Sequence, residues 1–144
     1  MRNTIDTRHV AALRARCDEW ELEGREILDK YSDRTLALIY NGLGPDSFPA
    51  WLRAVVTALS PDLEPDALIH DVEWHEADGT RAGFDASNAR FRRNGYRCAK
   101  ARFGWADPRR YLLMNRARRF ANYCQLFGWK AWSTPSASVE EAVR

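Results

Sequence analysis

Two segments of this chain hold residue types that could hydrolyse an ester. The first, residues 40–44, reads Tyr-Asn-Gly-Leu-Gly, and the second places His70 beside Asp71. A flexible glycine loop can present carbonyl oxygens to a hard cation, and a nearby carboxylate can complete such a site. An adjacent imidazole can take a proton from water. Together the two segments predict a metal-assisted hydrolase.

The His-Asp pair must be positioned by a helix, which we expect to run from Pro65 to about Glu76. Proline suits the first turn of a helix because its missing N–H has no partner to lose there. Adjacent helical residues point about 100° apart. His70 and Asp71 can therefore flank one cleft, one directed at a metal ion and the other at a water molecule.

A second helix, expected from Phe84 to about Phe103, carries the candidate partners of His70. Asp85 and Asn88 are three residues apart and share a face of this helix. The short connection over 77–83 favours antiparallel packing of the two helices. Such packing would bring Asp85 or Asn88 to the distal ring nitrogen of His70. A partner of this kind selects the imidazole tautomer and stabilises the imidazolium.

In the order of these motifs, residues 40–91 resemble the phospholipase A2 superfamily. Tyr40-x-Gly42-x-Gly44 is similar to its calcium loop, which is written Y-x-G-x-G. His70-Asp71-x-x-Trp74 is similar to its H-D-x-x-Y helix, and Asn88-x-x-Phe91 is similar to the D-x-x-F of its partner helix. The resemblance implies a mostly helical fold built around an antiparallel helix pair.

The resemblance also implies a Ca²⁺-dependent reaction on a glycerophospholipid ester. His70 would deprotonate the attacking water, without a covalent intermediate. Asn88 stands where the family has an aspartate, so that either Asp85 or Asn88 could orient His70. The ligands of the ion would be the Asp71 carboxylate and the backbone carbonyls of Tyr40, Gly42 and Gly44.

A second interpretation makes the chain a non-enzymatic protein. Its overall character also resembles small structural or accessory proteins encoded by bacteriophages and prophages. Asn88 in place of a carboxylate favours this alternative, because a protein can keep the fold of an enzyme without its activity. The sequence leaves both interpretations open.

Helical spacing of apolar residues extends over most of the remaining chain, and no segment alternates as a strand would. We therefore expect a mostly α-helical single domain over residues 1–132, with a polar tail over 133–144 and at most a small hairpin near 77–84. The other expected helices run from Thr7 to about Lys30, from Ser32 to Tyr40, from Phe48 to Leu59, and from Pro108 to about Phe127.

Charge is strongly segregated along the chain. Residues 1–89 hold 9 lysines and arginines against 17 aspartates and glutamates, whereas residues 90–130 hold 12 against a single acidic residue, Asp107. Such a pattern is typical either of two functional surfaces or of two layers that attract each other.

The basic segment supports two functional hypotheses besides simple pairing with the acidic half. One is contact with the phosphates of a phospholipid membrane surface, helped by interfacial aromatic side chains. The other is a nucleic-acid-binding module over residues 90–130. The residues expected to contact lipid or phosphate are Arg109, Arg110, Arg116, Trp129 and Trp132.

The three cysteines, Cys17, Cys98 and Cys124, are widely spaced and odd in number. They predict buried thiols in a reducing compartment. No apolar run is long enough to span a bilayer, and the start of the chain lacks the pattern of a secretory signal. We expect a cytoplasmic protein, or one associated with a virion or delivered by a phage or a specialised secretion route.

Overall fold

Helices make up the regular structure of residues 6–40, 57–58 and 60–134, the part of the chain that the computed structural model describes. No strand occurs in these ranges, so the predicted all-α class is confirmed. Of the helix expected over 48–59, all but residues 57 and 58 lies outside the described residues. The elements are α1 (Thr7–Glu19), η1 (Arg25–Lys30), α2 (Asp33–Ile39), η2 (Pro61–Leu63), α4 (Glu64–His75), α5 (Arg81–Arg102), α6 (Pro108–Phe127) and α7 (Trp129–Ser133).

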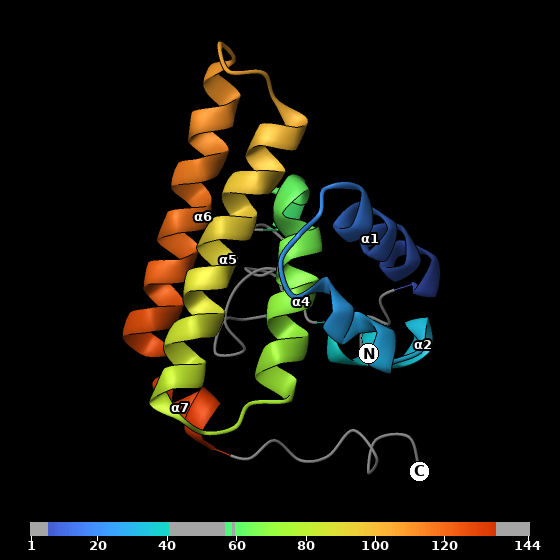
Figure 1. Ribbon diagram of the computed structural model, residues 1–144, viewed down its shortest axis with the longest axis vertical. Coiled ribbons are helices and arrows are strands. Elements are labelled where there is room, and N and C mark those ends of the chain that lie inside the picture. Colours follow the sequence, from blue (N-terminus) through green and yellow to red (C-terminus); the bar gives the residue numbers. More distant parts are fainter. Residues whose placement is uncertain (1–5, 41–56, 59, 135–144) are drawn as a thin grey trace.

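Three long helices, α4, α5 and α6, lie side by side, with α5 in the middle (Figure 1). The first elements of the chain, α1, η1 and α2, pack on the other side of α4. Helices α4 and α5 run antiparallel, as expected from the short connection between them. Helix α6 extends beside α5 over the length of both helices.

Side-chain caps set the starts of the two longest helices. Thr80 accepts a hydrogen bond from the backbone N–H of Gly83 at 3.1 Å, so that α5 begins directly after the turn. Asp78 accepts in turn from the N–H of Thr80 at 2.8 Å. Asp107 accepts from the N–H of Arg109 at 2.9 Å and begins α6. These bonds satisfy N–H groups that the first turn of a helix leaves unpaired.

The helix expected from Thr7 to Lys30 is wrong in one respect, because α1 ends at Glu19. The backbone then bends through Glu21 and Gly24, which have φ values of 51° and 80°. The side chain of Asn94 on α5 accepts from the backbone N–H of Glu23 at 2.8 Å and donates to its carbonyl at 2.9 Å. Arg97 donates to the Glu21 carbonyl at 2.6 Å. Because these side chains replace the lost helical bonds, the bend carries few unpaired backbone groups.

The core lies where the N-terminal elements meet α4 and α5, and it continues between α5 and α6. Gly95 allows the close approach of α5 to α6, since a Cβ atom there would overlap the Cβ of Ala117. The buried apolar side chains of this cluster include Val10, Leu13, Leu22, Leu28, Leu36, Leu63, Leu68, Ile69, Val72, Phe91 and Leu113.

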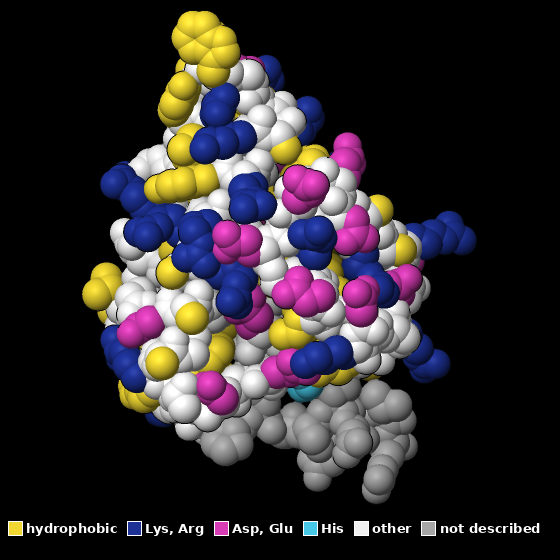
Figure 2. Space-filling model, in the orientation of Figure 1, with side chains coloured by type: hydrophobic (Ala, Val, Ile, Leu, Met, Phe, Trp, Pro, Cys, Tyr) yellow, Lys and Arg dark blue, Asp and Glu magenta, His cyan; other side chains and the backbone are white. Residues whose placement is uncertain are grey.

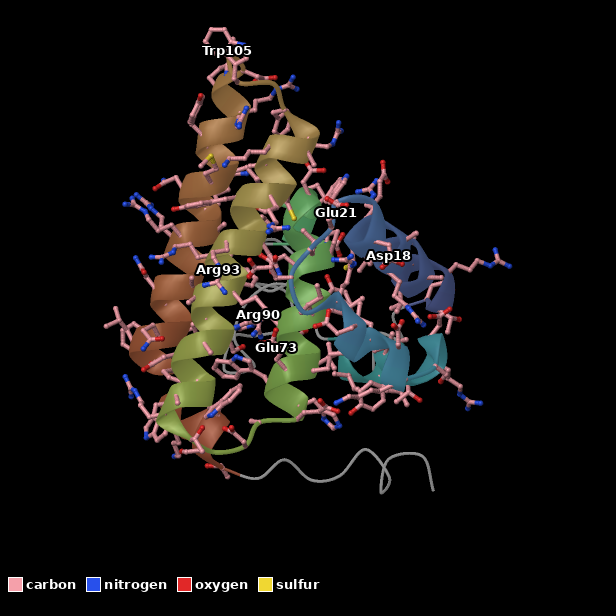
Figure 3. The ribbon with its side chains drawn as sticks, viewed as in Figure 1. Asp18, Glu21, Glu73, Arg90, Arg93 and Trp105 are labelled. Carbon is pink, nitrogen blue, oxygen red and sulfur yellow. The ribbon has the colours of Figure 1, made fainter. Side chains whose placement is uncertain are left out.

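Opposite charges meet between α5 and the acidic half of the chain. Arg90 on α5 faces Glu73 on α4, with 2.8 Å between Nη1 and Oε1 (Figure 3). Arg93 reaches Glu23 at 2.9 Å, and Arg102 reaches Asp62 at 3.0 Å. For α5, the charge pattern therefore reflects attraction between two packed layers.

Helix α6 differs from α5 because it has five arginines and no acidic residue. On the face shown in Figure 2, Lys and Arg side chains follow α5 and α6, whereas most Asp and Glu side chains lie toward α4 and α1. Arg109 pairs with Asp107, just before α6, at 2.8 Å. Arg110, Arg118 and Arg119 form no ion pair within the described ranges.

The chain turns back after α6 into a short helix that the sequence did not predict. Trp132 of α7 is 5% exposed and donates from Nε1 to the Thr80 carbonyl at 2.9 Å. Of the expected tail, residues 135–144 lie outside the described residues. None of the helices described has both the length and the apolar character of a membrane span. All three cysteines are free thiols, with Cys17 and Cys98 buried and Cys124 half-buried.

Candidate functional site

His70 lies in the second half of α4, facing α5, and it is only 9% exposed. Its Nε2 atom is 3.1 Å from Oδ1 of Asn88. The rings of Trp74 and Phe91 flank the imidazole, with centroids 5.2 and 4.9 Å from its own. Of the two partners that the sequence allows, Asn88 is the one in direct contact with His70.

Burial lowers the pKa of His70 to about 4, and the hydrogen bond with Asn88 opposes this change only in part. The ring is therefore uncharged at neutral pH. Because an amide oxygen only accepts hydrogen bonds, Nε2 must carry the ring hydrogen. Nδ1 then holds the free lone pair that a general base requires.

Two further side chains continue the network beyond Asn88. Nδ2 of Asn88 donates to Oε1 of Gln125 on α6 at 2.9 Å. Nε2 of Gln125 donates to Oδ1 of Asp85 at 2.6 Å. The structure thus connects both candidate partners with His70, Asn88 directly and Asp85 through two amides. Gln125 was not predicted, because only the packing of α6 on α5 brings it to this place.

Asp71 lies on the side of α4 that faces Tyr40. It is seven residues after Glu64, which is two helical turns and thus the same side of the helix. Glu64 accepts a hydrogen bond from the hydroxyl of Tyr40 at 2.9 Å. The pKa of Tyr40 is raised by burial and by the negative charges of Glu64 and Asp71. The start of the predicted glycine loop therefore lies near the predicted carboxylate ligand.

The rest of the predicted calcium loop, including Gly42 and Gly44, lies outside the described residues. Among the residues described, no group of three or more His, Cys, Asp or Glu side chains is placed to hold a metal ion. The predicted ligand set contains a single carboxylate, and its other ligands are main-chain oxygens. Asp71, which is half-buried and close to Tyr40, fits such a set.

A cluster at the start of α4 was not predicted from the sequence. Glu64 is 9% exposed and bonds both Tyr40 and His9, whose Nε2 atom is 3.0 Å from Oε1 of Glu64. The cluster ties α1 and the end of α2 to α4. It therefore holds Tyr40 in place at the point where the candidate loop begins.

Two further carboxylates on α4 lie beneath α5. Asp66 is fully buried, and neither of its oxygens has a hydrogen-bond partner among the described residues. Burial raises its pKa well above the ordinary value, and the negative charge of Glu73 adds to this effect, whereas the nearby side chain of Asn94 opposes it in part. Burial also raises the pKa of Glu73, although the bond with Arg90 opposes the change. In the sequence, Asp66 and Glu73 could have been recognised as buried acids because they stand among apolar residues of one predicted helix.

The residues expected to contact lipid lie in different surroundings. Trp129 is 37% exposed at the start of α7, whereas Trp132 packs inside the molecule. Arg109 is exposed but bonds Asp107, and the half-buried Arg116 lies 3.5 Å from the hydroxyl of Ser60. Arg110 is half-buried near the start of α6. The large apolar side chains that are most exposed are Trp105, at the tip between α5 and α6, and Leu126 and Phe127 near the end of α6 (Figure 3).

Comparison of the chain with protein-family models, with curated proteins and with solved structures gave no match.

Proposed function

We propose that this chain hydrolyses an ester of a glycerophospholipid, with His70 as the general base. The observation that carries the proposal is the hydrogen bond between Nε2 of His70 and Oδ1 of Asn88, within the antiparallel pair α4–α5. This bond leaves Nδ1 able to accept a proton from water. The position of Asp71 beside Tyr40 adds support, since both belong to the predicted calcium site.

The residues around His70 have separate roles in this proposal. Asn88 holds the tautomer and bonds the imidazolium after proton transfer. Trp74 and Phe91 cover the ring and limit the access of bulk water. The same burial that keeps His70 uncharged makes it a weak base, so we expect slow turnover at neutral pH.

Asp71 and the backbone carbonyls of Tyr40, Gly42 and Gly44 would hold the Ca²⁺ ion. When bound, such an ion polarises an ester carbonyl and stabilises the developing oxyanion. Asp71 supplies the only side-chain charge in this ligand set, so the affinity for the ion should depend on it.

Replacement of His70 tests the proposed base. We expect His70→Ala to abolish Ca²⁺-dependent release of fatty acid from phosphatidylglycerol vesicles. His75→Ala is the matched control, because His75 lies on the same helix and has an edge-to-face contact with Tyr31. Its activity should equal that of the unmodified chain. Equal turnover by the His70→Ala variant would overturn the assignment of His70.

Calcium-dependent stability tests the ion site separately from turnover. A ligand that binds only the folded chain raises its melting temperature. We expect millimolar CaCl₂ to raise the Tm, and Asp71→Asn to remove this increase. Asp18→Asn, which removes an exposed carboxylate paired with Arg25 at 3.5 Å, should keep it. An unchanged Tm of the original chain in CaCl₂ would contradict the site.

A specific observation favours one alternative function, binding of nucleic acid by α6. Its five arginines are not balanced by any acid on the helix, and three of them form no ion pair within the described ranges. Binding to a random-sequence duplex, compared with binding to phosphatidylglycerol vesicles over a series of salt concentrations, separates the two functions. If His70 proves dispensable and neither ligand binds, a non-enzymatic structural role is supported instead.

A further inference from the structure

The hydrogen bonds that run from His70 to Asp85 all have the same direction. Asp85 is at the outer end, where its side chain is 52% exposed. Gln125 lies between Asp85 and Asn88, and Asn88 lies between Gln125 and the buried ring. Each of the two amides has one face that donates and one that accepts. The orientation of either amide therefore determines what it offers to its neighbour.

The orientations of the two amides are set one after the other, beginning at the surface. The exposed carboxylate of Asp85 offers its oxygens as hydrogen-bond acceptors. Gln125 must therefore direct its NH₂ group to Asp85, and its oxygen faces Asn88. Asn88 must then donate to that oxygen, so its own oxygen faces His70. The ring can satisfy this oxygen only with a hydrogen on Nε2.

We propose that Asp85, acting through Gln125 and Asn88, is a positioning residue that selects the Nε2–H tautomer of His70. No proton travels along this path, since each amide only keeps its orientation. The carboxylate lies at the surface, and two amides transmit its effect to the buried ring. The catalytic consequence rests on the proposed function, whereas the tautomer itself does not.

Without an acceptor at residue 85, the amides can rotate by half a turn. Gln125 would then offer its NH₂ group to Asn88, and Asn88 would offer its own to Nε2 of His70. The ring would respond by moving its hydrogen to Nδ1, which removes the lone pair that the proposed base requires. Loss of Asp85 should therefore give a mixture of two neutral tautomers.

The test is ¹⁵N NMR of the imidazole nitrogens at pH 7.5, where the ring is neutral. We expect the original chain to show a single His70 tautomer with the hydrogen on Nε2, and Asp85→Ala to show both. Arg81→Gln is the matched control. It removes the ion pair with Asp85, in which Nε and Oδ1 are 3.4 Å apart, but keeps the acceptor. Its tautomer should be unchanged.

A second variant tests the direction of the network. In the double variant Asp85→Ala with Gln125→Glu, the new carboxylate can only accept from Asn88. It should therefore restore the single Nε2–H tautomer although residue 85 has no acceptor. A merely structural role of Asp85 would not give this recovery. A single Nε2–H tautomer in Asp85→Ala, or a persistent mixture in the double variant, would overturn the proposal.

The hydrolysis assay then tests the consequence for activity. We expect turnover by Asp85→Ala to fall in proportion to the population of the Nδ1–H tautomer, and turnover by the double variant to recover. If no variant hydrolyses phospholipid but the tautomers change as expected, the proposed function fails while the positioning role stands.

Discussion

The partner of His70 is an amide, Asn88, and not a carboxylate. This difference changes the electrostatics of the buried pair. An aspartate beside His70 would place a charge in a buried environment, and its desolvation would have to be offset by a charged imidazolium. The amide avoids this penalty because both partners are neutral. The neutral pair is a weak base, so the proposed hydrolysis should be slow.

Asp66 should make the stability of the chain depend on pH. Its raised pKa means that the folded chain keeps a proton that the unfolded chain releases above the ordinary value of 3.8. Its contribution to stability is thus complete below that value and is lost as the pH rises toward the pKa in the folded state. One such proton changes the free energy of unfolding by at most about 1.4 kcal/mol per pH unit.

We therefore expect Asp66→Asn to be more stable than the original chain at pH 8 and to lose this advantage at pH 3.5. Thermal unfolding followed over this pH range measures the effect. Glu21→Gln, at an exposed position near the bend, should leave the pH dependence as it is. A parallel pH profile for Asp66→Asn and the original chain would show that Asp66 is not buried as an acid.

Sequence reasoning at the residue scale predicted that either Asp85 or Asn88 would reach His70, and Asn88 contacts it directly. Helical spacing places Asp85 and Asn88 on one face, and an antiparallel neighbour brings that face to His70. Spacing within one helix says nothing about which residue of a third helix lies opposite. Gln125 depends on the register of α6 against α5 and could not be predicted in this way.

At the scale of elements, the bend after α1 shows how a distant side chain decides where a helix ends. Apolar spacing continues beyond Glu19, and Gly24 is the only local signal against a helix, worth about 1 kcal/mol relative to alanine. The decisive bonds come from Asn94, which lies on another helix 71 residues after Glu23. By contrast, the caps at Ser32 and Asp107 lie beside the helices they begin, so these starts were predicted from the sequence. The start of α5 was predicted at Phe84, three residues late, because Thr80 was assigned to a loop and not to a cap.

Asn94→Ala should destabilise the chain strongly. The substitution leaves the N–H and the carbonyl of Glu23 without their partner in a position that α5 covers. Unpaired buried groups cost about 1–3 kcal/mol each, so for these two groups we expect a loss of about 2–6 kcal/mol in the free energy of unfolding. Urea denaturation measures this loss. Asn122→Ala, on the exposed face of α6, should change it by less than about 0.5 kcal/mol.

At the scale of the whole molecule, the basic segment of the sequence is divided between two helices with different surroundings. On α5, Arg90, Arg93 and Arg102 pair with acidic residues of the first half of the chain and join the layers. The exposed arginines of α6 are Arg109, Arg118 and Arg119. The segregation of charge along the chain predicted either attraction between layers or a functional surface. Because the counts cannot tell one helix face from another, the sequence could not show which arginines pair between the layers and which stay exposed.

Removal of two charges from α6 should therefore weaken binding to a polyanion more than removal of two charges from α5. We expect Arg118→Gln with Arg119→Gln to lower the slope of log K against log salt for a DNA duplex by about two, since each phosphate contact contributes about 0.9. The control is Arg93→Gln with Arg97→Gln, two residues that already pair with Glu23 at 2.9 and 3.5 Å. Equal weakening in both pairs would show that only net charge matters.

The bond between Asn94 and Glu23 also has a consequence for the order of events during synthesis. A ribosome releases the chain from its N-terminus, so residues 20–24 emerge long before the amide that completes their bend. The N-terminal helix can pack on α2 and α4 as these emerge, but the bend keeps unpaired backbone groups until α5 has left the exit tunnel. Slow exchange of the Glu23 amide hydrogen with deuterium would then mark the moment at which α5 of a nascent chain has bonded the bend.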